Sequence, residues 1–156
     1  MTRWSITPLT QAEAEEVAAW RYPGEYAFYD VDSEPEGLAE LLDPARRGED
    51  YLAARGHDGS LEGFVQLEAA RGGVEIGVGL RPDLTGRGLG LAFTNVAIEL
   101  ARHRGAERIT LAVAAFNLRA IRVYERARFV ETGRHIRHLA GRDWEFVDME
   151  LHRRSP

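Results

Sequence analysis

Three glycines, Gly86, Gly88 and Gly90, alternate with other residues where a long helix is predicted to start. Glycine lets successive backbone N–H groups turn toward one point, and a helix N-terminus adds a partial positive charge of roughly +0.5 there. Such a loop binds a phosphate or pyrophosphate, although three glycines also fit an ordinary tight turn. A dinucleotide fingerprint would need its third glycine where this chain has Leu91, so a Rossmann-type site is disfavoured.

A strand predicted over residues 74–80 leads toward this loop. Its apolar side chains share one face, whereas Glu75, Gly77 and Gly79 share the other. Two glycines beside a carboxylate leave a slot in which a ligand chain could lie against the backbone, and a β-bulge is the structural alternative. Glu75 is our first candidate for a general base, with an exposed strand-face acid as the alternative interpretation.

A further helix is predicted from Asn117, which is well placed to cap it, to about Ala127. Tyr124 lies seven residues after Asn117, two turns along the same helix face. Its hydroxyl could donate a proton to a leaving group. An isolated tyrosine on a helix is more often a packed aromatic side chain, so the pattern by itself leaves both roles open.

The composition excludes several kinds of chemistry. All 20 Lys+Arg residues are arginine, and the chain has no cysteine. Without lysine there is neither a P-loop nucleotide site nor a Schiff-base enzyme. Without cysteine there are no disulfides, thiolate–metal sites or cysteine nucleophiles. The five histidines lack the spacing of a metal-binding helix, and we predict no metal site.

The length and the distribution of apolar residues favour one globular domain over residues 1–156. The chain is 44% hydrophobic and 29% charged, which is ordinary for globular proteins. No stretch approaches the ~20 apolar residues of a membrane span, and the start lacks the apolar segment of a signal peptide. We therefore expect a cytoplasmic protein that does not enter a membrane.

Taken together, these segments resemble the GNAT N-acetyltransferase superfamily. The acetyl-CoA-binding motif of that family, Gln/Arg-x-x-Gly-x-Gly/Ala, corresponds to residues 85–90. Its second pattern, Asn-x-x-Ala-x-x-x-Tyr followed by Gly-Phe, corresponds to Asn117, Ala120, Tyr124, Arg128 and Phe129. The match is strongest over residues 74–133. Two positions depart from the family pattern, because Thr85 replaces Gln/Arg and Arg128 replaces Gly.

The resemblance implies that acetyl-CoA lies where the strand ending at Leu80 splays from a strand at 109–113. The Leu80 backbone would pair with the pantetheine arm, and backbone amides of residues 86–91 would hold the pyrophosphate. The full set of predicted cofactor-binding residues is Leu80, Gly86, Arg87, Gly88, Leu89, Gly90, Leu91, Asn117, Arg119 and Arg122.

The same resemblance assigns two catalytic roles. Tyr124 would protonate the departing CoA thiolate, and Glu75 or a water would accept the proton of the amine. No covalent intermediate is required, which agrees with the missing cysteine. The implied function is direct acetyl transfer to a primary amine, and the strand around Glu75 and the compact size are similar to bacterial enzymes that act on protein N-termini or small amines.

The charge is distributed unevenly along the chain. Residues 1–78 hold 6 Arg against 16 Asp and Glu, a net of −10, whereas residues 79–156 hold 14 against 9, a net of +5. Most of these charges are expected on solvated surfaces. Our hypothesis is that the acidic and aromatic stretch over residues 22–36 receives a cationic amine, by charge and by cation–π contact.

Two other functions compete with the enzyme. A non-catalytic acyl-CoA-binding sensor would keep the cofactor loop but lack turnover, and Tyr124 argues against it. A nucleic-acid-binding module is supported only by the arginine-rich second half, and a formal net charge of −5 without an interleaved aromatic platform counts against it. The expected partners are thus acetyl-CoA and an amine acceptor, not nucleic acid or membrane, and a homodimer stays open.

Hydrophobic periodicity predicts the elements that must position these residues. Strands are predicted over 4–9, 50–55, 61–69, 74–80, 109–113, 129–138 and 144–151, and helices over 10–20, 34–42, 88–104 and 117–127. We predict an α/β (α+β) fold in which helices pack on one twisted sheet. The resemblance to the GNAT fold implies that this sheet is mixed and mostly antiparallel, with about seven strands flanked by about four helices.

Overall fold

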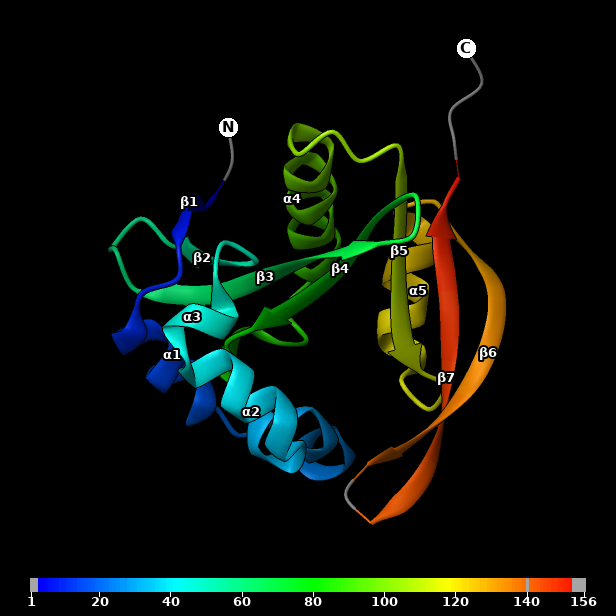
Figure 1. Ribbon diagram of the computed structural model, residues 1–156, viewed down its shortest axis with the longest axis horizontal. Coiled ribbons are helices and arrows are strands. Elements are labelled where there is room, and N and C mark those ends of the chain that lie inside the picture. The colour runs from blue at the N-terminus through cyan, green and yellow to red at the C-terminus, as the bar shows by residue number, and fades with distance from the viewer. Residues whose placement is uncertain (1–2, 140, 153–156) are drawn as a thin grey trace. The chain divides into compact units, whose positions relative to one another are not determined.

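The computed structural model describes residues 3–139 and 141–152 (Figure 1). Its strands are β1 (Ser5–Pro8), β2 (Tyr51–Arg55), β3 (Leu61–Ala70), β4 (Gly73–Leu80), β5 (Arg108–Ala114), β6 (Phe129–Leu139) and β7 (Arg142–Leu151). Its longer helices are α1 (Gln11–Ala18), α2 (Pro35–Leu42), α4 (Gly90–His103) and α5 (Leu118–Arg126). The strand order is β1-β2-β3-β4-β5-β7-β6. The predicted α/β fold with a mixed seven-stranded sheet is confirmed.

The chain forms two compact units that interleave in sequence. The first unit contains the residues up to Gln66 and the segment Gly79–Thr85, and the second contains Leu67–Val78 and the residues from Gly86 onward. None of the helices in the described part of the chain has the length and apolar character that a membrane span requires.

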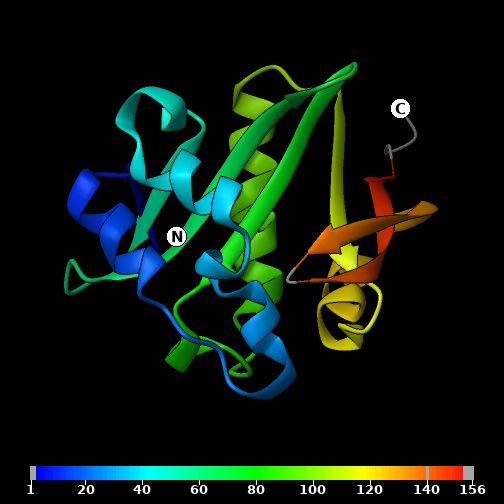
Figure 2. The same cartoon turned by 60° about the horizontal axis from the view of Figure 1, so that its bottom comes forward.

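In the first unit, α1 and α2 (blue and cyan in Figure 2) share one buried cluster with β2 and the start of β3. Thr10 caps α1 as predicted, because its side chain accepts from the N–H of Glu13 while the Glu13 side chain accepts from the N–H of Thr10. β1 pairs antiparallel with β2. The buried cluster between these elements consists of Leu9, Ala14, Val17, Trp20, Leu41, Tyr51, Ala53 and Leu61.

Four short helical segments in the first unit were not predicted, and the last of them is the 3₁₀ turn η3 (Pro82–Leu84) before the glycine loop. The aromatic stretch forms the 3₁₀ turns η1 (Gly24–Tyr29) and η2 (Val31–Ser33), and α3 (Pro44–Arg47) follows α2. In α3, Asp43 accepts from the backbone N–H of Ala45 and a proline occupies the first turn. A local cap of this kind needs no hydrophobic periodicity, so a search based on periodicity misses it.

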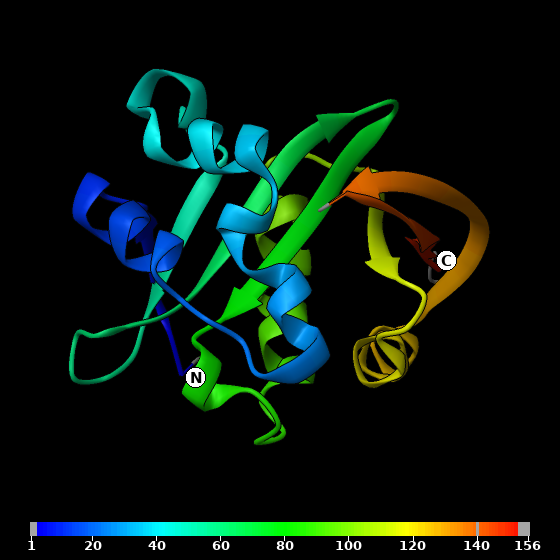
Figure 3. The same ribbon diagram turned by 90° about the horizontal axis from the view of Figure 1, so that it is seen from below.

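The second unit is built on the ladder of β5, β7 and β6, in which both neighbouring pairs are antiparallel. β6 and β7 form a long, curved hairpin, with an irregularity in register between Glu131 and Gly133. Figure 3 shows α5 nearly end-on, beside this ladder. β4 pairs with β5 in parallel, and this is where the sheet becomes mixed.

Helix α4 begins at Gly90, two residues later than predicted. The cause is the backbone conformation of Gly86 and Gly88, whose φ angles are +74° and +78°. Helical residues have φ near −63°, so the helix cannot extend back through these glycines. The turn just before the helix is therefore fixed by left-handed backbone rather than by helical propensity.

Gly73 brings β4 close to β5, and we predict that Gly73→Ala destabilises the fold. A Cβ at this position would lie 1.9 Å from the carbonyl oxygen of Arg108, its partner in the parallel ladder. Because the obstacle is backbone, the strands must shift, and the free energy of unfolding should fall by about 1–3 kcal/mol in urea titrations.

Gly37→Ala is the matched control for this measurement. Its Cβ would meet only Glu34 Cδ at 3.6 Å, an ordinary contact, and alanine favours the helix by up to about 1 kcal/mol. Equal stability of the Gly73 variant and the unmodified protein would contradict the close approach of the two strands.

Candidate functional site

The N-terminus of α4 is arranged to receive an anion. No side chain in the described part of the chain caps this helix, and its first turn holds no acidic residue. By contrast, α1 carries a complete capping box. A helix N-terminus leaves backbone N–H groups without an intrahelical partner, and these groups together with the helix dipole attract a phosphate.

The glycine loop lies directly against α5. A Cβ built at Gly86 would lie 3.4 Å from Nη1 of Arg119, so this guanidinium sits beside the loop. Gly90 similarly approaches Val123, whose Cγ2 would lie 3.4 Å from an added Cβ. The loop and α5, which the sequence places about 30 residues apart, therefore form one surface in the second unit.

Asn117 holds the start of α5 in position. Its side-chain oxygen accepts from the backbone N–H of Ala120 at 3.1 Å, and the residue is buried. This is the capping role that the sequence suggests. It explains why an asparagine stands at this position without requiring contact with a ligand. Its place in the predicted cofactor-binding set is therefore indirect, since it orients the helix that carries Arg119 and Arg122.

The three arginines predicted to contact phosphates are all exposed. Arg119 is the one whose guanidinium lies beside the glycine loop. In the described residues, Arg87 and Arg122 make no hydrogen bond or ion pair, so their charges are not neutralised by carboxylates. An arginine is always protonated and can bind a phosphate through two N–H groups, which suits all three to this task.

Two departures from the family pattern have clear structural consequences. The Thr85 hydroxyl donates to the carbonyl oxygen of Pro82 at 2.7 Å, so it closes the preceding turn instead of reaching outward. Arg128 adopts φ +80°, the left-handed conformation that the usual glycine would take without strain. The turn after α5 thus keeps its shape despite the substitution, at a cost of about 1–2 kcal/mol.

Pairing between β4 and β5 covers only the start of β4. The register joins Gly73, Val74 and Glu75 to Arg108, Ile109 and Thr110, and it ends there. Both strands continue beyond this point, to Leu80 and Ala114 respectively. Backbone groups of β4 after Glu75 are thus not used by a ladder with β5.

The end of β4 is held by hydrogen bonds within the first unit. The Tyr22 hydroxyl donates to the Leu80 carbonyl oxygen at 2.7 Å, and the N–H of Arg81 donates to the Glu62 carbonyl at 2.8 Å. Burial raises the pKa of the Tyr22 phenol, and the charge of Asp30 raises it further. The hydroxyl therefore stays protonated, and both sides of the peptide group that joins Leu80 to Arg81 have a partner.

The slot expected beside Gly79 is filled by an aromatic ring. A Cβ at Gly79 would lie 2.3 Å from Cε1 of Phe64. The ring cannot swing away freely, because its centroid lies 6.2 Å from those of Trp20 and Tyr51. Gly79 is thus explained by close packing with Phe64, and not by space left for a ligand.

Glu75 lies half-buried on β4, and in the described residues its carboxylate has no hydrogen bond or ion pair. Burial raises the pKa of this carboxyl above its usual value of 4.5. Arg137 opposes the rise, Glu68 and Asp148 add to it, and His135 opposes it. A carboxylate with a raised pKa and no fixed partner is suited to accept a proton.

Tyr124 is partly buried on α5, and its ring packs edge-on against Phe129 with centroids 6.1 Å apart. Packing of the ring does not exclude a role for the hydroxyl, since the two ends of a tyrosine serve different purposes. Both interpretations of Tyr124 from the sequence therefore remain compatible with the fold.

The comparisons with known proteins agree with this geometry. Residues 12–129 match the model of the Acetyltransferase (GNAT) family. The chain belongs to this GNAT family. A mycothiol acetyltransferase of Beutenbergia cavernae is 34% identical over 138 residues, which cover 81% of this chain and 45% of that protein. One from Clavibacter sepedonicus is 39% identical over 89 residues, covering 56% and 28% respectively.

This GNAT chain spans less than half the length of these curated relatives. A solved structure of spermidine N-acetyltransferase from Vibrio cholerae, in complex with CoA and spermine, has a TM-score of 0.77 and 18% identity. The similarity covers 96% of this chain and 95% of that one. At this identity the likeness establishes the shared GNAT fold.

The acidic stretch of this GNAT chain is partly neutralised by arginines of its own unit. Arg21 bonds Asp32 at 2.7 Å and lies 4.0 Å from Asp30, and Arg46 pairs with Glu36. Asp30 also accepts from the backbone N–H of Tyr22. Less negative charge is therefore available for a cationic amine than the sequence suggests.

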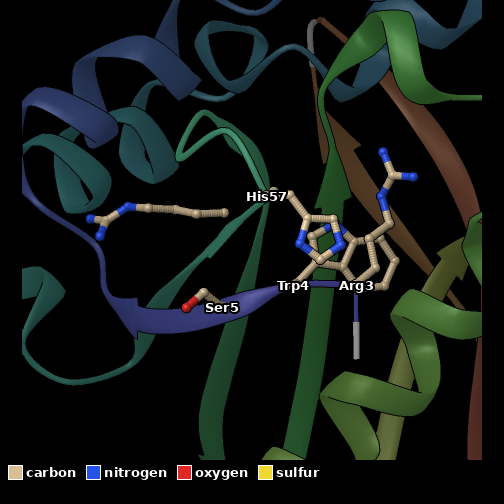
Figure 4. Close-up of a pocket in the computed structure, with 6 residues that line it drawn as sticks. Arg3, Trp4, Ser5 and His57 are labelled. Carbon is tan, nitrogen blue, oxygen red and sulfur yellow. The ribbon is translucent and has the colours of Figure 1, made fainter. Parts of the chain in front are cut away.

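A hollow of about 310 Å³ lies elsewhere in the first unit, at the β1–β2 edge (Figure 4). Two arginines line it, but Arg3 bonds the buried Glu62 and Arg55 bonds Glu13 through two N–H groups. Their charges are thus already paired. No predicted site residue lines the hollow, whose lining residues are Arg3, Trp4, Ser5, Arg55, Gly56 and His57.

Sequence reasoning missed two features of the site. Tyr22 was assigned only to an aromatic stretch, and its bond to Leu80 joins residues 58 positions apart. Arg137 and His135 were also missed as neighbours of Glu75. Their alternate spacing in a predicted strand places both on one face, and this signal could have grouped them.

Because the pKa of Glu75 is raised, the difference in stability between the Glu75→Gln variant and the unmodified protein should depend on pH. In the unfolded chain this carboxyl ionises at a lower pH than in the fold, so its ionisation opposes folding as pH rises through the two values. Glutamine removes that cost. The variant should be more stable than the unmodified protein at pH 7.5 and equally stable near pH 3, as measured by urea unfolding.

Proposed function

We propose that this GNAT protein transfers an acetyl group from acetyl-CoA to a primary amine. The observation that carries this proposal is the uncapped start of α4 behind the glycine loop, with the Arg119 guanidinium beside it. Mycothiol acetyltransferase relatives and a GNAT-fold structure solved with CoA and spermine support it. The comparisons give no support to the non-catalytic sensor.

The cosubstrate would be held mainly by backbone. Amides of Gly86–Leu91 would bind the pyrophosphate, with charge supplied by Arg87, Arg119 and Arg122. The pantetheine arm would pair with β4 near Leu80. The carbonyl of Leu80 already accepts from Tyr22, and its second lone pair remains for the pantetheine.

The amine must lose a proton before it attacks. For an ammonium with a pKa of about 10.4, forming the free amine at pH 7 costs about 4.6 kcal/mol. Glu75, directly or through a water, would accept this proton, since burial raises the basicity of its carboxylate. The acceptor would be a protein N-terminus or a small amine.

The amine then attacks the thioester carbonyl, and the oxyanion of the tetrahedral intermediate needs a donor. A backbone N–H of β4 near Leu80 would supply it. The carbon–sulfur bond breaks next, and the Tyr124 hydroxyl would protonate the leaving thiolate. Since a thiol has a pKa near 8.5, this leaving group needs only modest help.

We also propose that residues 1–156 act as one catalytic domain in the cytoplasm, with neither membrane nor nucleic acid as partner. A homodimer is compatible with this proposal and is not required by it.

The first test measures thiol release from acetyl-CoA across a panel of amines, with Tyr124→Phe as the variant. Loss of the acid should lower kcat at saturating amine by about 100-fold, the lower end for a general acid, while KM for acetyl-CoA changes little. Leu118→Ala, an exposed residue of the same helix, is the control. An unchanged kcat in the Tyr124 variant would remove Tyr124 from the acid role.

The second test follows kcat/KM against pH. With Glu75 as base, activity should rise with pH through the raised pKa of Glu75, and Glu75→Gln should lose this limb. Glu68→Gln removes a negative charge that raises the pKa of Glu75, so the limb should move to lower pH. An acid limb that neither variant alters would indicate that another group is the base.

A further inference from the structure

In the β6–β7 hairpin, three side chains fix one arginine in place. We call Asp148, His135, Arg137 and Phe146 the hairpin cluster. His135 Nδ1 lies 3.0 Å from Asp148 Oδ2, and Arg137 Nε donates to His135 Nε2 at 2.8 Å. The His135 ring stacks on Phe146 with centroids 5.6 Å apart, and the Arg137 guanidinium carbon lies 4.6 Å from the same ring centroid.

These contacts determine the arrangement of hydrogens in the cluster. A guanidinium only donates, so Nε2 of His135 must offer a lone pair to Arg137. The hydrogen of the neutral imidazole is then on Nδ1, where it points to the Asp148 carboxylate. Asp148 thus orients His135, and His135 orients Arg137.

Arg137 is held without being neutralised. Its terminal Nη1 and Nη2 atoms make no hydrogen bond or ion pair within residues 3–139 and 141–152, and the side chain is exposed. Arg134, on the same strand, is instead bonded to Glu131 and Glu145. The Arg137 guanidinium therefore presents the end with two NH₂ groups, which fits the two oxygens of a carboxylate.

The held guanidinium and the proposed base act on one another. Among the charges that act on Glu75, that of Arg137 is the strongest one that favours the ionised carboxylate. No ion pair joins them in the described residues, so each remains available to another group. The second unit thus holds one negative and one positive group, each open to an opposite charge on a ligand.

We propose that Arg137 binds the carboxylate of the acceptor, and that the acceptor is a small amine carrying a carboxylate, such as an amino acid. This inference rests on the proposed acetyl transfer and names its substrate class. The ammonium of such a zwitterion faces Glu75 while its carboxylate takes the open end of Arg137. A phosphate dianion fits less well, because it carries a second negative charge and Glu68 and Asp148 already add negative charge around Glu75.

The test compares amino acids with their carboxamides, which keep the amine and lose the negative charge. In the unmodified protein, kcat/KM should be at least tenfold higher for the amino acids. Arg137→Gln should lower it about 10- to 100-fold for amino acids, the range for a charged hydrogen-bonded pair, and less than threefold for the amides.

Arg142→Gln is the matched control. Arg142 also stacks on an aromatic ring of this hairpin, with its guanidinium carbon 3.9 Å from the centroid of Trp144. It belongs to no hairpin-cluster contact, so its replacement should leave the ratio of the two substrate classes unchanged. Arg137→Lys should keep part of the preference, because it retains the charge and loses the two-pronged geometry.

Calorimetric binding of the amino acids separates this inference from the proposed function. Binding that is lost in Arg137→Gln would support the carboxylate site even without turnover, in which case acetyl transfer is the part that fails. Amides that bind and react as well as amino acids would overturn the inference, as would an equal loss for both classes in Arg137→Gln. Preference for phosphate-bearing amines would overturn the assignment to a carboxylate.

Discussion

The start of α4 is the constraint on which the rest of the site depends. A 14-residue helix that begins without a side-chain cap leaves its first N–H groups to solvent or a ligand. Most helices avoid this by a cap like that of Thr10 on α1. In α4 the two residues with left-handed backbone just before the helix are glycines, which have no side chain to cap these groups. The helix thus forgoes the stabilisation that a side-chain cap would give, and the same uncapped N–H groups can bind an anion.

The same loop dictates how α5 must pack. Gly90 allows Val123 to approach the first turn of α4, and Gly86 leaves room for Arg119. Asn117 fixes where α5 begins, and the left-handed Arg128 returns the chain to β6. The two family patterns, separated by about 30 residues in the sequence, therefore lie in contact and form one structural unit.

Much of this could be predicted because it depends on local rules. Capping at Thr10 and Asn117 follows from residue type and spacing, and each of the seven strands shows an apolar pattern. What could not be predicted depends on contacts distant in sequence. The ring of Phe64 over Gly79 and the Tyr22 bond to Leu80 are of this kind, because glycine spacing in a strand does not reveal what lies above it.

The absence of lysine acquires a physical meaning at the hairpin cluster. An ammonium could replace the charge of Arg137, but it could not donate to His135 and still offer two parallel N–H groups to a carboxylate. A flat guanidinium also stacks on Phe146, which limits its motion. Arginine thus serves both as the fixed element and as the ligand-binding element.

Placement of Arg137 near Glu75 couples binding to proton transfer. The positive charge of Arg137 favours the ionised carboxylate and so holds down the pKa that burial raises. An acceptor carboxylate on Arg137 would neutralise that charge and let the pKa of Glu75 rise further. This change would offset the fall in the pKa of Glu75 that a neighbouring ammonium causes. An acceptor without a carboxylate cannot produce this change, so the proposed carboxylate would act on the rate of proton transfer as well as on affinity.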